Sequence, residues 1–114
     1  MNSLKKVILI SAGDPASIST EITIKAMEDC KIIKNIRPIV SSSLDRIEDS
    51  KKNINNNIKL NEMKDKVNIS DYKENSLNII HINLFEEIFF GKPNTKYTSF
   101  IKKSIVDCVR IKMN

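Results

Sequence analysis

Residues 13–21 combine a glycine, two acidic side chains, a proline and three hydroxyls in the order Gly-Asp-Pro-Ala-Ser-Ile-Ser-Thr-Glu. They follow the apolar run at residues 7–10, which places them where a strand turns into a helix. A glycine lets the backbone turn and approach a ligand, and free N–H groups that open a helix favour an anion such as a phosphate. Open α/β sheets bind ligands at this edge. The segment therefore indicates an anion-binding loop, with a plain turn before a capped helix as the alternative.

The other residues that could do chemistry are isolated. His81 is the only histidine, and Cys30 and Cys108 fall in different expected helices with no Cys or His at metal-ligand spacing. We therefore predict no metal site, reduced thiols, and a structural or exposed role for His81. Lys92 lies beside a proline turn and is expected to be solvated. No residue of this chain is assigned a catalytic role.

The elements that position the loop begin with a strand at residues 7–10, whose continuous apolar run is typical of a central strand buried on both faces. A helix follows from Ser19, which is expected to be its N-cap. Its predicted inner face repeats every four residues and consists of Ile18, Ile22, Ala26 and Cys30. Residues 37–40 form a second strand that starts near Pro38. Strand, helix and strand in this order predict a parallel crossover.

The second half of the chain alternates in the same way. Residues 43–52 predict a short polar helix capped by Ser43, residues 53–57 are an asparagine-rich break, and residues 53–76 carry the weakest pattern. Residues 77–82 form a third strand, and residues 84–90 a helical turn or an irregular loop. A closing helix is expected to be capped by Thr98 or Ser99. Its predicted inner face consists of Ile101, Ile105, Cys108 and Val109.

Length and composition fit one soluble α/β unit. The chain has 114 residues, 40% of them hydrophobic, and no apolar run near the roughly 20 residues needed to cross a bilayer. We expect no membrane contact and a cytoplasmic location. The 19 basic residues are scattered among 14 acidic ones, and two tyrosines and four phenylalanines offer little surface for stacking on bases. Nucleic-acid binding is therefore the least favoured function.

Two segments resemble a known family. The pattern Gly13-Asp14-Pro15-Ala16-x-Ile18-x-x-Glu21, after Val-Ile-Leu-Ile, is similar to the Gly-Asp-Pro-Ala-Gly-Ile-Gly-Pro-Glu opening of the 4-hydroxythreonine-4-phosphate dehydrogenases. Residues 91–94, Gly-Lys-Pro-Asn, and the helix after them resemble the Gly-Lys-Pro-Ser segment of the same family. The resemblance runs over nearly the whole chain, is weakest across residues 42–76, and matches only the opening part of the family's sequence.

The resemblance implies an α/β fold of the isopropylmalate and isocitrate dehydrogenase type, here as an incomplete layered sheet-and-helix domain. It implies a homodimeric enzyme that uses NAD or NADP and a divalent metal to oxidise 4-phosphooxy-threonine in pyridoxal 5'-phosphate biosynthesis. The backbone around Asp14 and Ile18 is expected to lie near the dinucleotide. Ser17, Ser19 and Thr20 replace the Gly, Gly and Pro of the family, which puts that contact in question.

The family's three histidine ligands, its substrate-binding His-Thr pair and its phosphate-binding Lys, Asn and Arg all lie downstream of the matched region. None of them can be carried over to this chain. The leading hypothesis is therefore a single, truncated amino-terminal segment of a dehydrogenase at residues 1–114, inactive alone, with the chain ending where a further strand is expected. The alternative is a non-enzymatic pseudoenzyme or partner-binding module that pairs with a full-length subunit through an exposed sheet edge. A basic nucleic-acid binder is the third reading.

Overall fold

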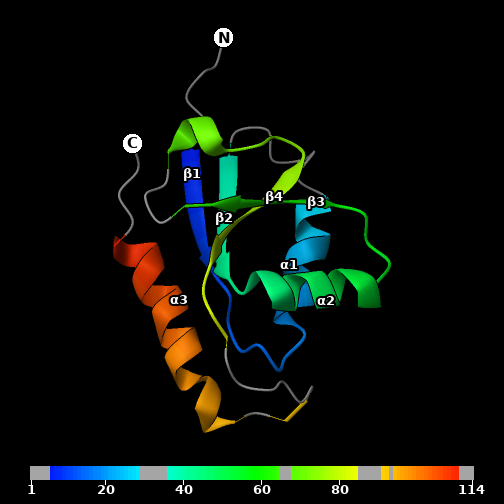
Figure 1. Ribbon diagram of the computed structural model, residues 1–114, viewed down its shortest axis with the longest axis vertical. Helices are drawn as coiled ribbons and strands as arrows, with labels where there is room; N and C mark the ends of the chain where they lie inside the picture. The colour runs from blue at the N-terminus through cyan, green and yellow to red at the C-terminus, as the bar shows by residue number, and fades with distance from the viewer. Residues whose placement is uncertain (1–5, 29–35, 65–67, 85–90, 93, 111–114) are drawn as a thin grey trace.

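The computed structural model describes residues 6–28, 36–64, 68–84, 91–92 and 94–110 (Figure 1). Strands and helices alternate along most of the chain. In chain order they are β1 (Lys6–Ser11), α1 (Ser19–Glu28), β2 (Ile36–Ser42), α2 (Leu44–Asn53), β3 (Lys59–Met63), the 3-10 turn η2 (Ile69–Asp71), β4 (Ser76–His81), the 3-10 turn η3 (Thr95–Tyr97) and α3 (Thr98–Arg110).

The described strands form a four-stranded sheet in the order β1-β2-β4-β3. All three neighbouring pairs are parallel. Parallel neighbours need a crossover between them, and α1 and α2 supply it after β1 and β2. The α/β fold expected from the sequence is therefore confirmed.

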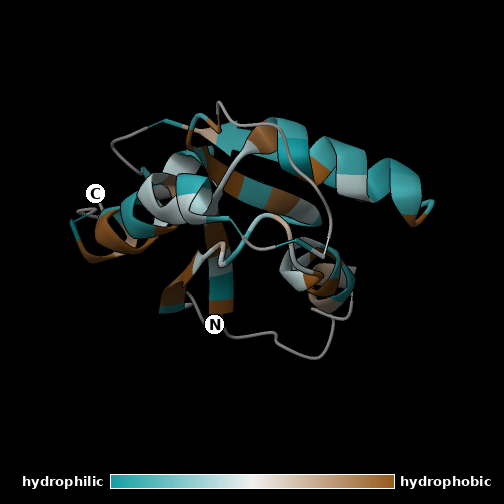
Figure 2. Ribbon diagram, turned by 90° about the horizontal axis from the view of Figure 1, so that it is seen from below, coloured by the Kyte–Doolittle hydropathy of each residue, from teal (hydrophilic) through white to brown (hydrophobic). Residues whose placement is uncertain are grey.

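The core lies on both faces of this sheet. Helices α1 and α2 cover one face, where a fully buried cluster forms around Ile24, Ile47 and Ile79. On the other face Ile39, Met63 and Ile80 pack together. Helix α3 lies beside β1 and β2, away from α1 and α2 (Figure 1). Hydrophobic residues gather along the strands, whereas α2 is largely hydrophilic (Figure 2).

Asn78 fixes the pairing of β3 with β4. This buried residue lies opposite Asn61 in the register, and its Oδ1 accepts from Asn61 Nδ2 at 2.7 Å and from the Lys73 N–H at 3.0 Å. Its Nδ2 donates to the Lys73 carbonyl at 3.0 Å. A buried amide with its partners made favours one register, because a slip would leave it unpaired. The sequence did not reveal β3, since its Lys-Leu-Asn-Glu-Met has no apolar run.

Several sequence predictions are confirmed. The three predicted strands correspond to β1, β2 and β4, and the predicted polar helix is α2. Its N-cap is Ser43, whose hydroxyl accepts from the Arg46 N–H at 3.3 Å. The helix ends at Asn53, at the start of the asparagine-rich break, and Asn55 takes a φ of 51°. Asparagine is one of the few residues that adopts this conformation readily.

The predicted central position of the first strand is wrong for the described sheet. Strand β1 is an edge strand, and Ile8 is 42% exposed. Only β2 and β4 have a neighbour on both sides. An apolar run marks a strand that can be buried on both faces, but it does not say where the strand lies in the sheet. Pro38 lies near the start of β2, one residue before the pairing of β2 with β4 begins at Ile39, so it belongs to one ladder and not to both.

The predicted inner face of α1 is wrong, and that of α3 is only partly right. In α1 the buried stripe is Thr20, Ile24 and the partly buried Met27, while Ile18 and Ile22 are exposed. In α3 the predicted Ile101 does pack against the core beside the buried Phe100, but Ile105 and Val109 are exposed and Ser104 is buried instead. Both true stripes contain a hydroxyl residue, which an apolar repeat does not reveal. Cys30, Pro93 and residues 85–90, which also carried predictions, lie outside the described residues.

The predicted caps of these helices differ as well. Ser19 is the first residue of α1, and its hydroxyl turns back to the carbonyl oxygens of Ala12 and Asp14, at 3.2 Å from each. Before α3, the cap is Asn94, whose side chain accepts from the Lys96 N–H at 2.9 Å and starts η3. Thr98 is already helical. Among the described residues no helix has the length and apolarity to span a membrane.

Ser104 ties α3 to the sheet, and its removal tests that packing. The Ala12 N–H donates to Ser104 Oγ at 2.7 Å, and Oγ donates to the Ser41 carbonyl at 2.7 Å, all buried. We expect Ser104→Ala to lower the free energy of unfolding by about 2 kcal/mol, because a buried N–H loses its acceptor. Urea unfolding measures this loss. The matched control is Ser99→Ala at an exposed position of the same helix, and equal stability of the two variants would contradict the assignment.

Candidate functional site

The candidate site lies at the carboxyl edge of the sheet. Strand β1 runs into residues 13–19, which we call the 13–19 loop, and β2 and β4 end nearby at Ser42 and His81. Since all described strands are parallel, these three ends meet at one edge (Figure 1). This is the edge at which open α/β sheets bind ligands.

Asp14 builds the turn of the 13–19 loop. Its Oδ1 accepts from the Ala16 N–H at 2.8 Å, and its carbonyl accepts from the Ser17 N–H at 3.1 Å. An aspartate that binds the backbone two residues on mimics a backbone turn, and Pro15 presets the next φ angle. Asp14 is therefore partly buried and engaged within the loop, while Ile18 is 70% exposed on its outer side.

One of the two glycines of the chain, Gly13, lies in this loop, and the other, Gly91, bonds to it. Gly13 has a φ of +75° and Gly91 a φ of +74°, a region that side-chain-bearing residues rarely adopt. The Gly91 N–H donates to the Ala16 carbonyl at 2.9 Å. The two segments that carried the family resemblance are thus in direct contact, although they lie far apart in the sequence. Lys92, beside Gly91, is exposed as expected.

Arg46, in the first turn of α2, binds the backbone of the 13–19 loop. Its side chain is almost fully buried, with the residue 4% exposed. Its Nε donates to the Pro15 carbonyl at 2.7 Å, its Nη1 binds Ser50 Oγ, and its Nη2 lies 3.5 Å from the Ser17 carbonyl. The same Nη2 lies 3.5 Å from Glu21 Oε2. A guanidinium presents several donors in a fixed plane, so one side chain can fix several loop carbonyls at once.

Sequence reasoning missed Arg46. The residue lies in a helix of low hydropathy, predicted only as a short polar helix, and belongs to no motif. The available signal was its position, since Arg46 is followed by Ile47 and by Ser50 one turn later, and these three residues form the buried side of α2. Glu21 Oε1 is buried and makes no hydrogen bond, which leaves the acidic member of this cluster only partly satisfied.

His81 has a local structural role. Its Nδ1 accepts from the Leu44 N–H at 3.0 Å, and its Nε2 lies 3.0 Å from Asn83 Oδ1. Because Nδ1 is an acceptor here, Nε2 carries the proton and donates to Asn83. Leu44 is the first residue of α2, so His81 satisfies one of the N–H groups that a helix start leaves unpaired.

The resemblance implies a divalent metal and a dinucleotide, and the described residues do not form a complete binding site for either. Within the described ranges no group of three or more His, Cys, Asp or Glu side chains could hold a metal ion. Burial, with a smaller effect of Asp107, raises the pKa of the Cys108 thiol, which disfavours the reactive thiolate. At the 13–19 loop, the N–H groups of Ala16, Ser17 and Ser19 already have acceptors inside the loop. An open cradle for a pyrophosphate is therefore not formed by these three groups.

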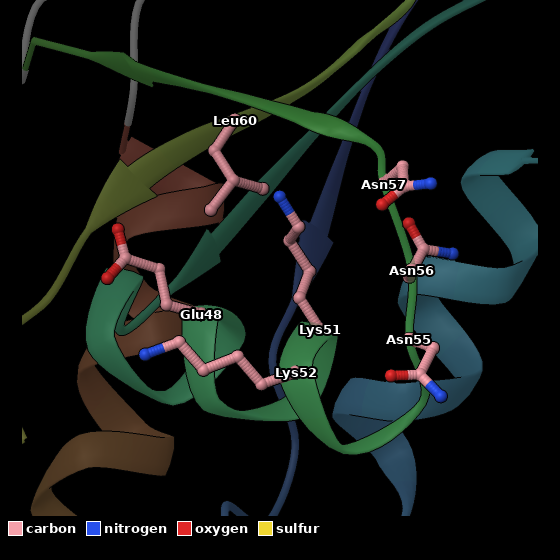
Figure 3. A pocket seen from close by; sticks show the side chains of 7 residues that line it. All are labelled: Glu48, Lys51, Lys52, Asn55, Asn56, Asn57 and Leu60. Atoms are coloured by element: carbon pink, nitrogen blue, oxygen red, sulfur yellow. The ribbon is translucent and has the colours of Figure 1, made fainter.

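A separate hollow of about 740 Å³ lies between the end of α2 and the start of β3 (Figure 3). Polar side chains line most of it, namely Glu48, Lys51, Lys52, Asn55, Asn56 and Asn57, with Leu60 at its wall. Arg46 and the 13–19 loop lie at the other end of α2. The hollow is therefore not part of the candidate site.

Replacement of Arg46 tests its hold on the loop. We expect Arg46→Lys to lower the free energy of unfolding by about 3 kcal/mol, because lysine keeps the charge but cannot serve the same acceptors. Amide exchange at Ser17 should become faster, since the turn loses its support. Urea unfolding and NMR hydrogen exchange measure the two effects. Arg110→Lys, at the exposed end of α3, is the matched control and should change neither quantity.

The sequence alone matches no protein-family model, and no curated protein matches it. Among solved structures, the chain is similar to a 4-hydroxythreonine-4-phosphate dehydrogenase from Burkholderia phymatum, with a TM-score of 0.75 and 20% sequence identity. The match covers 90% of this chain and 31% of that protein. The chain thus spans about a third of its structural neighbour. At this identity the likeness shows the fold, so the chain has the α/β fold of a segment of a dehydrogenase.

Proposed function

We propose that this chain provides the ligand-facing sheet edge for NAD- or NADP-dependent oxidation of 4-phosphooxy-threonine, a cytoplasmic step of pyridoxal 5'-phosphate biosynthesis. The observation that carries the proposal is the hydrogen bond from Gly91 to Ala16. It joins the two segments that resemble the 4-hydroxythreonine-4-phosphate dehydrogenases. The structural neighbour, whose name gives that activity, supports the same assignment at the level of the fold.

In this proposal residues 1–114 act as one α/β unit that is inactive alone. Oxidation of an alcohol needs a group that takes the hydroxyl proton, and the family also uses a metal to polarise the forming ketone. The described residues offer no metal-ligand cluster, and His81 is engaged by Leu44 and Asn83. In this proposal the metal ligands and the substrate-binding residues lie outside the described residues, on a further chain segment or on a partner subunit of a homodimer like that of the family.

The proposed contribution of this chain is contact with the dinucleotide at Asp14 and Ile18. The N–H groups of Ala16, Ser17 and Ser19 are occupied, so the contact is proposed through the rest of the backbone around Asp14 and Ile18 and through the exposed Ile18 side chain. Ile18 offers an exposed apolar surface suited to a flat ring, and Asp14 lies at the turn beside it. An apolar wall with a few placed polar groups is usual for a cofactor site.

Titration with NAD and NADP tests this assignment. We expect the methyl resonances of Ile18 to shift on addition of either dinucleotide, while those of Ile8, an exposed isoleucine on the β1 edge, stay unchanged. Ile18→Ser should weaken the binding by about tenfold, since it removes most of an apolar contact worth 1–2 kcal/mol. The same sample with 4-phosphooxy-threonine and a divalent metal should form no reduced cofactor. Turnover would contradict inactivity of the chain alone, and an unshifted Ile18 would contradict the cofactor contact.

A second candidate function is a non-enzymatic module that pairs with a full-length dehydrogenase subunit. The observation that favours it is the edge strand β1, which is apolar and carries the exposed Ile8. Natural edge strands are usually protected by charges, prolines or bulges, whereas an unprotected edge recruits another strand. The nearby helix α3 adds the exposed Ile105 and Val109 and an apolar hollow of about 280 Å³.

A pull-down with a full-length dehydrogenase subunit of this fold separates the two candidates. If β1 pairs with the subunit, Ile8→Lys should reduce recovery of the complex at least tenfold, because a charge on an edge strand blocks edge pairing. Ile22→Lys, at an exposed position of α1 outside the β1 edge, is the control and should bind like the wild type. A wild-type chain that captures no subunit would leave the enzyme-segment proposal as the only one of the two.

A further inference from the structure

The serines of the 13–19 loop take the positions at which an anion would be held. Ser17 Oγ accepts from the Ser19 N–H at 3.1 Å, which is the first helical N–H of α1. An anion bound at a helix start uses N–H groups of this kind as its donors. In this chain the serine hydroxyl is already the acceptor.

The hydroxyl of Ser17 is itself held firmly. Its Oγ lies 2.8 Å from the Asp14 carbonyl and 2.9 Å from Ser19 Oγ. Ser19 Oγ in turn lies 3.2 Å from the Ala12 carbonyl. The space above Gly13 is limited by the same group, because a Cβ atom built there would lie 3.4 Å from Ser19 Oγ. Both side chains thus fill the loop rather than project from it.

Charge in and around the loop also disfavours an anion. The Asp14 carboxylate is fixed at the turn by the Ala16 N–H. The nearby buried cation, Arg46, directs its donors at the carbonyl oxygens of Pro15 and Ser17 and at Glu21. Its charge therefore neutralises groups of the protein. A phosphate at the loop would meet a negative carboxylate and three amide groups that are already bonded.

We infer that Ser17 is a specificity-determining residue, whose hydroxyl occupies the first N–H of α1, that of Ser19, and so excludes phosphate groups from the 13–19 loop. The inference rests on the proposed function, which places the dinucleotide at this edge of the sheet. It states which part of the ligand can lie against the 13–19 loop. The moiety that fits is neutral and apolar, against the exposed side chain of Ile18. A charged phosphate must lie elsewhere.

The test uses inorganic pyrophosphate as a bare anionic probe and amide shifts of the 114-residue chain as the readout. In the wild type the amides of Ala16, Ser17 and Ser19 should not shift with pyrophosphate. In Ser17→Gly and Ser17→Ala the Ser19 amide should shift, and pyrophosphate should bind at least about fivefold more tightly, which corresponds to the ~1 kcal/mol of the lost intramolecular bond. Ser17→Thr keeps the hydroxyl and should behave like the wild type.

Ser70→Gly is the matched control, because Ser70 is an exposed serine of η2 whose hydroxyl also makes a short local bond, to Asn68 Oδ1 at 2.9 Å. Ser70 lies before β4, at the amino end of the strands. In the Ser70→Gly variant, pyrophosphate should therefore not change the chemical shift of the Ser19 amide. The inference is overturned if the wild-type Ser19 amide shifts as strongly as that of Ser17→Ala, or if neither folded variant gains a shift. A parallel titration with NAD distinguishes the two proposals. If NAD leaves the Ile18 methyl resonances unshifted while pyrophosphate shifts the Ser19 amide in Ser17→Ala, the cofactor contact is rejected and the inference about Ser17 stands.

Discussion

A guanidinium removed from water must be surrounded by acceptors, and Arg46 meets this requirement with the backbone of the 13–19 loop. The carbonyl oxygens of Pro15 and Ser17 and the carboxylate of Glu21 are its partners, together with Ser50 of its own helix. Burial of an unpaired charge costs several kcal/mol, so α2 and the loop can only be placed together. The position of the loop at the sheet edge therefore depends on this interaction as well as on the turn residues themselves.

The parallel sheet provides the second constraint. The registers of β1 with β2 and of β2 with β4 bring the carboxyl ends of three strands to one edge, where Ser104 anchors α3 to the ends of β1 and β2. The segment that precedes α3 is thereby carried back to the loop, and Gly91 can donate to Ala16. This contact joins residues that only the complete set of registers brings together. It is local in space and highly non-local in sequence.

The sequence predicted the elements better than their environments. Apolar runs identified β1, β2 and β4, and Ser43 identified the start of α2. The faces of α1 and α3 were not fully predictable from apolar repeats, because Thr20 and Ser104 belong to the buried stripes while Val109 is 80% exposed. Ser104 can be buried because its hydroxyl is paired with the Ala12 N–H and the Ser41 carbonyl, and both partners come from outside α3. The same limit explains Arg46, whose acceptors lie about thirty positions away.

Side chains decide which groups the candidate site leaves free for a ligand. Gly13, Asp14 and Pro15 make the turn between β1 and α1, within a fold that agrees with that of a dehydrogenase at 20% sequence identity. Ser17 and Ser19 stand where that family has glycines, and their hydroxyls bond the loop to itself. Backbone geometry at such a turn is set by a few residues with unusual φ or short side chains. Ligand choice depends on which N–H groups remain free, so two loops of one shape can differ in the ligand they accept.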